Sequence, residues 1–196
     1  MVVLRRIRRI VTEPVRRHRD EALVTWSTVP GSRPTCQGDA HVSCGPALVD
    51  VRTSADHPLV SNGPTSKLRM VAPGAVTAGR YGLVEYHVAP NSPGAAPHFH
   101  QTFSESFYVL TGQLTVYHAG SWDPFGPGDY ALVHEGGAHG FRNDGDEWAS
   151  FLILFAPGIA RENFFLEMAE RRSGRTLTPQ QMTAFYARHD QVMVAP

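Results

Sequence analysis

The sequence has few cysteines and no long apolar run. Its two cysteines, Cys36 and Cys44, have no histidine pair beside them at the spacing of a zinc finger, so we expect two free thiols rather than a disulfide framework. No stretch reaches the ~18 apolar residues that a membrane-spanning helix needs. The arginines of residues 1–11 are not followed by the apolar segment of a secretory signal. We therefore expect a cytoplasmic protein without a membrane partner.

The sequence also lacks net charge, because 18 basic residues balance 18 acidic ones. Seven arginines lie within the first twenty residues: Arg5, Arg6, Arg8, Arg9, Arg16, Arg17 and Arg19. The other 176 residues carry 11 basic and 16 acidic side chains, so we expect no nucleic-acid partner for the folded part. The arginine-rich start is interpreted as a disordered extension or as residues upstream of the true start. A basic arm that touches nucleic acid or anionic lipid is the alternative.

Composition divides the chain into three regions. Gly, Pro, Ser and Thr are concentrated between Pro30 and Pro46 without hydrophobic periodicity, which is typical of a linker. We predict an arginine-rich, disordered extension and linker at residues 1–50, a β-barrel at 51–158 and a helical extension at 159–196. A hydrophobic content of 42% over 196 residues is enough for one core.

Short runs of Val, Leu, Tyr and Phe follow the linker, and Gly and Pro separate them. Turn signals at roughly 8–12-residue spacing indicate an all-β sandwich or barrel. The predicted strands cover residues 67–71, 81–88, 106–110, 114–118, 130–133, 138–142 and 149–155.

Two helices are predicted after the last strand. Apolar residues recur at helical spacing between Arg161 and Arg172. Thr178 to Gln181 form a capping box with proline at the first helical position, which predicts a second helix from Pro179 to about His189. The aromatic residues of these helices would be buried against the barrel mouth or against a dimer partner, and the sequence leaves both possibilities open.

Three histidines and a glutamate have the spacing of a metal site. Side chains two apart in a strand share a face, so His98 and His100 can project together. A turn at Gln101–Ser104 then lets Glu105 open the next strand and add a carboxylate. His139 lies in a separate run and would be the fourth ligand after long-range closure. The alternative is a pair of surface histidines, an unrelated glutamate and a core histidine.

These motifs resemble those of the cupin superfamily. The first cupin motif places a His-x-His pair and a glutamate between two glycines, and the second places a histidine and an asparagine after a Gly-Asp pair. The first motif here consists of Gly94, His98, His100, Glu105 and Gly112. The second consists of Gly128, Asp129, His139 and Asn143, with His134 where the family usually has proline.

The resemblance implies a cupin-type double-stranded β-helix, a jelly-roll barrel, with short C-terminal helices. It also implies one divalent transition metal bound by His98, His100, Glu105 and His139, and a homodimer. Imidazole and carboxylate ligands suit Fe, Ni, Mn, Cu, Co or Zn, so the metal stays open. The position of Asn143 usually supports a turn in this family.

The most similar family members are single-domain, quercetin-dioxygenase-like cupins. By this resemblance Glu105 would be both ligand and general base, provided that its environment raises its pKa. Our hypothesis is a metal-dependent, dioxygenase-like oxidoreductase that acts on an aromatic or enolisable small molecule. A non-catalytic small-molecule-binding cupin and a metal-dependent isomerase or cyclase are alternatives, because fold alone does not decide function.

Three apolar side chains are candidates for lining the pocket. Phe107 and Val109 share the strand face of Glu105, and Phe141 shares that of His139. A plain role in the barrel core is the alternative for Phe107 and Val109.

Two polar side chains form one face of an earlier predicted strand. If that face points inward, Glu85 and His87 would contact the substrate or support the metal ligands. A solvent-facing position is the alternative.

Overall fold

The computed structural model describes residues 49–57, 59–172 and 177–194. The cysteines and almost all of the predicted extension at residues 1–50 lie outside these ranges, as do residues 195 and 196 of the predicted helical extension. The predicted division at 50/51 and 158/159 stays a prediction. A single 3₁₀ turn, η1 (Ser54–Asp56), precedes the first strand.

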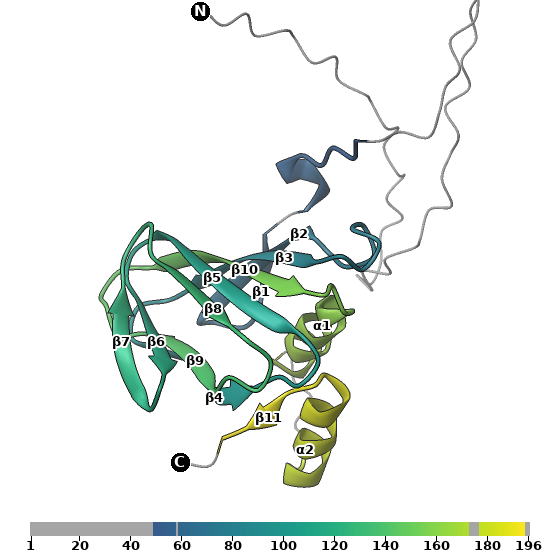
Figure 1. The fold of residues 1–196 in the computed structure, drawn as a ribbon. Coiled ribbons are helices and arrows are strands. Elements are labelled where there is room, and N and C mark those ends of the chain that lie inside the picture. Colours follow the sequence, from purple (N-terminus) through teal and green to yellow (C-terminus); the bar gives the residue numbers. More distant parts are fainter. Residues whose placement is uncertain (1–48, 58, 173–176, 195–196) are drawn as a thin grey trace, which may run out of the picture. The chain divides into compact units, whose positions relative to one another are not determined.

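Eleven strands in the described ranges form two sheets, in which every pairing is antiparallel. The six-stranded sheet consists, in spatial order, of β1 (Val60–Ser61), β2 (Ser66–Ala72), β3 (Gly82–Val88), β10 (Ala149–Ala156), β5 (Ser104–Thr111) and β8 (Tyr130–Val133). The five-stranded sheet consists of β11 (Val192–Met193), β4 (Ser92–Phe99), β9 (His139–Asn143), β6 (Leu114–His118) and β7 (Ser121–Phe125). From β3 to β6 and again from β7 to β11 the chain alternates between the sheets. The predicted all-β jelly-roll barrel is confirmed (Figure 1).

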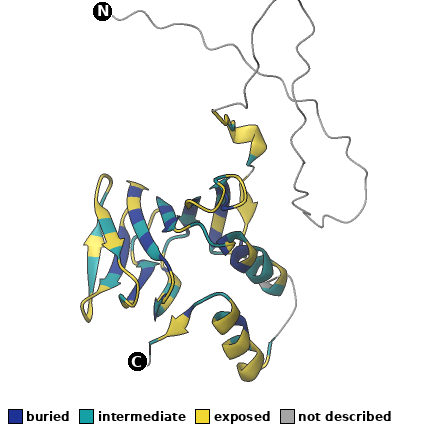
Figure 2. Cartoon of the chain, turned by 45° about the vertical axis from the view of Figure 1, so that its right-hand side comes forward, coloured by how far each residue is buried: buried dark blue, intermediate teal, exposed yellow. Residues whose placement is uncertain are grey.

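The core lies between the sheets because side chains alternate along the strands. In β3, Val84 and Tyr86 are buried while Glu85 is partly exposed, as the strand period of two requires. Buried residues accordingly alternate with more exposed ones along the strands in Figure 2. Phe107, Phe151 and their neighbours form one apolar cluster, and each fully buried phenylalanine contributes about 1.5–3 kcal/mol.

Two motif glycines are required by close backbone approach. Gly94 has a φ of +56°, and a Cβ there would lie 2.1 Å from the carbonyl oxygen of Phe141. Gly112 has a φ of +70°, and a Cβ there would lie 2.5 Å from the carbonyl oxygen of Trp148. Only glycine fits both the backbone conformation and the space. These contacts set how closely β4 passes β9 and how the chain leaves β5.

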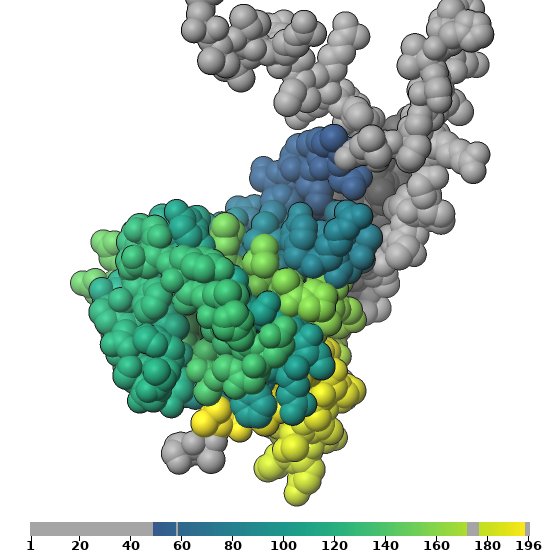
Figure 3. All heavy atoms as spheres, viewed as in Figure 1, coloured from purple at the N-terminus to yellow at the C-terminus, as the bar shows by residue number. Residues whose placement is uncertain are grey.

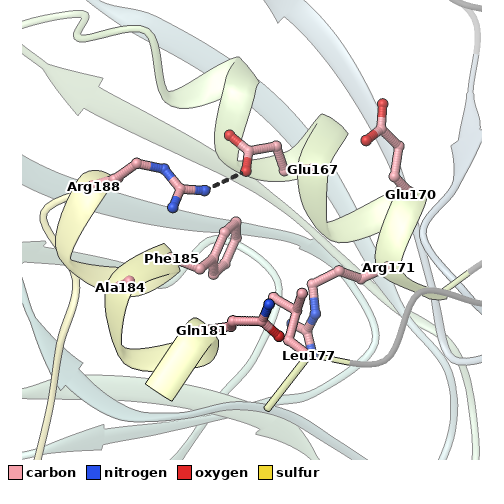
Figure 4. A pocket seen from close by; sticks show the side chains of 8 residues that line it. All are labelled: Glu167, Glu170, Arg171, Leu177, Gln181, Ala184, Phe185 and Arg188. Atoms are coloured by element: carbon pink, nitrogen blue, oxygen red, sulfur yellow. Dashed lines mark hydrogen bonds and ion pairs between the residues drawn. The ribbon is translucent and has the colours of Figure 1, made fainter. Parts of the chain in front are cut away.

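Both predicted helices are confirmed, as α1 (Arg161–Arg172) and α2 (Pro179–Arg188). The Thr178–Gln181 capping box is present. Phe185 is buried and stacks on Phe164 with ring centroids 5.3 Å apart. Figure 4 shows Phe185 together with an ion pair that joins Arg188 of α2 to Glu167 of α1. Within the described ranges, neither helix has the length and apolar composition needed to cross a membrane.

Four strands are missing from the predicted set. β4 has eight residues but contains Pro93, Gly94 and Pro97, which are typical of turns. β1 and β11 have two residues each, which is too few for a periodic pattern. β7 contains Pro124, a residue that argues against a strand interior. β11 matters most, because it brings the end of the described chain back to the barrel beside β4.

Asn143 closes the turn before β10. Its Nδ2 donates to the carbonyl oxygens of Val88 (3.1 Å) and Glu147 (2.7 Å), and its Oδ1 accepts from the backbone N–H of Gly145 (2.9 Å). The amide is 1% exposed. The role in a turn that the resemblance implies thus has a physical basis.

We expect Asn143→Ala to lower the free energy of unfolding by about 1–3 kcal/mol, because three backbone groups lose a buried partner. Urea unfolding followed by tryptophan fluorescence measures this change. Asp146→Ala, at an exposed position of the same loop, is the control. Equal unfolding midpoints for the two variants would contradict the assignment.

Candidate metal centre

The four predicted ligands meet inside the barrel. His98 is the second-last residue of β4, and His100 directly follows that strand. Glu105 lies in β5, and His139 is the first residue of β9. His98 pairs directly with His139 across the two strands, so their side chains share a face, and their ring centroids lie 4.4 Å apart. One ligand atom from each of the four residues lies within 4.8 Å of the others. All four side chains are buried.

A carbonyl oxygen fixes each imidazole. The Nδ1 of His98 donates to Ala96 (2.8 Å), that of His139 to Gly137 (2.9 Å) and that of His100 to Asp190 (2.5 Å). Because a carbonyl oxygen only accepts hydrogen bonds, Nδ1 of each ring carries a proton. Nε2 of His100 and of His139 therefore faces the carboxylate of Glu105 and shares a proton with it in the metal-free protein. Loss of that proton would free a lone pair on Nε2 for a metal ion.

Glu105 lies at the centre of the group. Its Oε2 is 3.1 Å from Nε2 of His100 and 2.8 Å from Nε2 of His139. Three imidazole nitrogens and one carboxylate at these separations suit a first-row divalent ion. The residues therefore fit the metal that the cupin resemblance implies, and the metal's identity is open.

The electrostatics favour His98 and Glu105 in their metal-binding forms. Burial, together with the neighbouring His139, lowers the pKa of His98 to about 3, so this imidazole is neutral at physiological pH. Burial raises the pKa of Glu105, but hydrogen bonds from His100 and His139 outweigh it and hold that pKa well below its usual range. The raised pKa that would favour Glu105 as a general base is thus not present. For His139, burial lowers the pKa but the bond to Glu105 raises it overall.

Aromatic rings border the ligands. Phe103 stacks on His100 at a centroid distance of 4.2 Å. Phe107 lies 5.8 Å from the ring of His139 and 6.0 Å from that of Phe141. Phe103 was missed because it lies in the predicted turn, although a phenylalanine among polar turn residues was a visible signal. Val109 is buried farther along β5, and its contact with a substrate stays a prediction.

The expectation that Glu85 and His87 line the pocket is wrong. Their side chains lie on the outer face of β3, because the alternate residues of this strand fill the core. His87 binds Glu85 at 2.8 Å, and Arg69 lies 3.4 Å from the same carboxylate. These residues form an ion-pair cluster on the outside of the six-stranded sheet.

Two residues outside the motifs also reach the site. Arg161, at the start of α1, is 5% exposed and interacts electrostatically with Glu105. Burial lowers the pKa of Arg161 to about 10, which leaves a cation at neutral pH. Asp190 supplies the carbonyl for His100. Helical periodicity predicted α1 but gave no sign that its first residue is buried.

Two cavities lie elsewhere on the molecule. One of about 250 Å³ is lined by residues of α1 and α2 (Figure 4), and one of about 440 Å³ is lined by residues of β2 and the loop before β3. None of the four candidate ligands borders either cavity.

Comparison with known proteins finds a family model and a relative that part of this chain resembles. Residues 84–155, which include all four candidate ligands, match the model of the Cupin domain family. Over 106 residues the chain is 28% identical to quercetin 2,3-dioxygenase of Bacillus subtilis (strain 168). The match covers 54% of this chain and 31% of that protein, so the chain spans about a third of its length.

Solved structures are also similar. An RmlC-like cupin from Shewanella frigidimarina shows 20% identity and a TM-score of 0.48, covering 58% of this chain and 93% of its own. The polyketide cyclase RemF from Streptomyces resistomycificus shows 24% identity and a TM-score of 0.47, covering 56% of this chain and 80% of its own.

We expect His98→Ala and His139→Ala to lower the metal content of the purified protein at least about tenfold, because each removes a ligand from a labile ion. Elemental analysis after dialysis measures metal per chain. Circular dichroism should show that both barrels stay folded.

His87→Ala is the matched control, since this histidine lies in a strand but outside the barrel interior. It should retain the metal content of the wild-type protein. Full metal content in both ligand variants would refute the site.

Proposed function

We propose that this chain, whose residues 84–155 form a cupin domain, is a metal-dependent oxidoreductase of the dioxygenase type. Its substrates would be dioxygen and an aromatic or enolisable small molecule, and both oxygen atoms would enter the product. The observation that carries the proposal is the convergence of three Nε2 atoms and one carboxylate on a buried point beside aromatic rings. Similarity to quercetin 2,3-dioxygenase supports the reaction type.

The chemistry of the substrate proton follows from the ligand set. A divalent ion held by these residues would act as a Lewis acid and make a bound enol or phenol hydroxyl more acidic. Glu105 is ionised, because its hydrogen bonds lower its pKa, so it is a weak base. It can accept a proton only from a hydroxyl that is already acidified. We therefore propose that Glu105 is a metal ligand, and that it accepts the substrate proton only after the bound metal ion has acidified the hydroxyl.

The three histidines hold the ligand geometry. Since their Nδ1 protons are engaged by carbonyl oxygens, the rings cannot flip without losing a buried hydrogen bond. His98 stays neutral over the physiological range because burial lowers its pKa. The site thus offers three fixed imidazole nitrogens and one negative oxygen donor.

The surroundings favour a planar, apolar substrate. Phe103 and Phe107 are each 1% exposed and contact the rings of His100 and His139. Phe141 packs against Phe107. Aromatic rings pack well against other aromatic rings in offset or edge-to-face arrangements. A flavonol or a similar enolisable aromatic matches this environment better than a sugar does.

Oxygen consumption tests the proposal. We expect the metal-loaded protein to consume dioxygen in the presence of at least one flavonol or enolisable aromatic from a small panel. Glu105→Gln, which keeps the side-chain shape but removes the charge, should lower this rate by about 10²-fold or more. Glu85→Gln makes the same change on the outer face of β3 and should leave the rate unchanged.

Metal binding without oxygen consumption would argue against the oxidoreductase. Substrate turnover without oxygen loss would then indicate isomerase or cyclase chemistry, and ligand binding without turnover would indicate a binding protein. Oxygen consumption that is equal in Glu105→Gln and the wild-type protein would remove Glu105 from the reaction.

We also propose that two copies pair through the outer face of the six-stranded sheet. Tyr108, Tyr130 and Leu132 are 43%, 58% and 47% exposed there, and Tyr108 pairs with Tyr130 across β5 and β8. In the described part of the chain, β8 is paired on one side only. An apolar face that continues to an open strand edge favours a second copy of the same strand.

Leu132→Glu should convert this dimer to a monomer on sizing chromatography, because it places charge within the apolar face. Val76→Glu changes an exposed apolar residue outside both sheets and should elute with the wild-type protein. A monomeric wild-type protein would contradict the pairing.

A further inference from the structure

We infer that residues 189–193, between α2 and the end of β11, are part of the metal centre and that Asp190 is a positioning residue for His100. This inference rests on the proposed metal site and adds a structural element that neither histidine motif contains. It explains why the chain returns to the barrel after two helices.

Asp190 binds the imidazole of His100 directly. Its backbone carbonyl accepts the Nδ1 proton at 2.5 Å, which fixes the tautomer and aims Nε2 at Glu105. The acceptors for His98 and His139 lie two residues before each histidine, at Ala96 and Gly137. The acceptor for His100 lies 90 residues away. His100 therefore depends on a distant segment, while the other two imidazoles are fixed locally.

The Asp190 side chain binds the backbone that follows His100. Its carboxylate accepts from the backbone N–H of Gln101 (3.0 Å), and from the backbone N–H (2.8 Å) and hydroxyl (2.7 Å) of Thr102. The φ of Asp190 is +49°, a conformation that aspartate tolerates better than most residues do. One residue thus holds both the ring of His100 and the turn beside it.

Arg161 anchors the residues on either side of Asp190. Its guanidinium donates to the carbonyl of His189 and to the side-chain oxygen of Gln191, each at 2.8 Å. The guanidinium lies 3.9 Å from the ring centroid of Phe164, an arrangement that supports a buried cation. The first residue of α1 consequently holds residues 189–191 in place, and Asp190 within them orients His100.

β11 completes the attachment. Val192 pairs with Phe99 and Met193 with His98 in an antiparallel ladder, and the N–H of Val194 donates to the carbonyl of Pro97 at 3.0 Å. Figure 1 shows β11 beside β4, and the C-terminal segment, yellow in Figure 3, forms part of the surface below the barrel strands. The strand that carries His98 is therefore paired with the same segment that orients His100.

The test compares substitutions at position 190 in the full-length protein. Asp190→Gly removes the carboxylate but tolerates the positive φ, and Asp190→Asn keeps an acceptor oxygen and also tolerates it. We expect the dissociation constant for Co²⁺, measured by chelator competition, to rise about 10–100-fold in Asp190→Gly. Asp190→Asn should recover most of the wild-type affinity.

A spectroscopic signal separates positioning from general loosening. Imidazole N–H protons of cobalt ligands are observable by NMR, and Asp190→Gly should speed the solvent exchange of the His100 signal while those of His98 and His139 persist. Asp123→Asn, in β7 at the edge of the five-stranded sheet opposite β11, weakens an ion pair with His118, so it should leave affinity and exchange unchanged.

Wild-type affinity and exchange in Asp190→Gly would overturn the inference. So would equally faster exchange or loss of all three N–H signals, which indicates unfolding of the whole site. If the wild-type protein binds no Co²⁺, the proposed metal centre fails. The positioning role is then tested by the solvent exchange of the His100 Nδ1 proton in the metal-free protein. Its protection in the wild-type protein and loss in Asp190→Gly would support that role, and equal exchange in both would refute it.

Discussion

The buried charge of Glu105 is the constraint on which the rest of the site depends. A carboxylate removed from water costs several kcal/mol even after relaxation of its surroundings, and Glu105 is 5% exposed. The protein offsets this cost with hydrogen bonds from His100 and His139 and with the cationic Arg161. A divalent ion would offset it further, since it would replace the shared protons with a larger positive charge. The ionised Glu105 is therefore stable inside the apolar barrel only because these hydrogen-bonding and cationic groups surround it.

Strand pairing explains how such a centre forms within an apolar core. The direct pairing of His98 with His139 puts both side chains on the inner face, and the turn after His100 delivers Glu105 from the opposite sheet. Gly94 lets β4 approach the backbone at Phe141 more closely than any side chain would allow. The ligands thus come from two sheets, and relative movement of those sheets would separate Glu105 from the imidazoles. Packing of Phe107, Phe141 and Phe151 across the interior opposes that movement.

The sequence predicted the parts of this structure that repeat or that lie close together in the chain. The period of two located most of the longer strands, the capping box at Thr178 located α2, and the His-x-His spacing located three of the four ligands. Glu85 and His87 were placed wrongly because a period of two says which residues share a face but not which face is inside. Asp190 could not be found at all. Its function lies in a backbone carbonyl, which every residue has, and in a contact across 90 positions.

The ligand set alone does not choose the reaction, because one fold and one metal site support many chemistries. The environment of the ligands adds the further constraints, above all the low pKa of Glu105 and the phenylalanine beside His100. Two of the imidazoles are oriented by carbonyl oxygens only two residues earlier in the chain. Their orientation is therefore fixed once the barrel strands pair. The third is set only when the segment around Asp190 docks against the turn at Gln101. Variation in the C-terminal extension can therefore change the geometry of the metal centre while all four ligands stay the same.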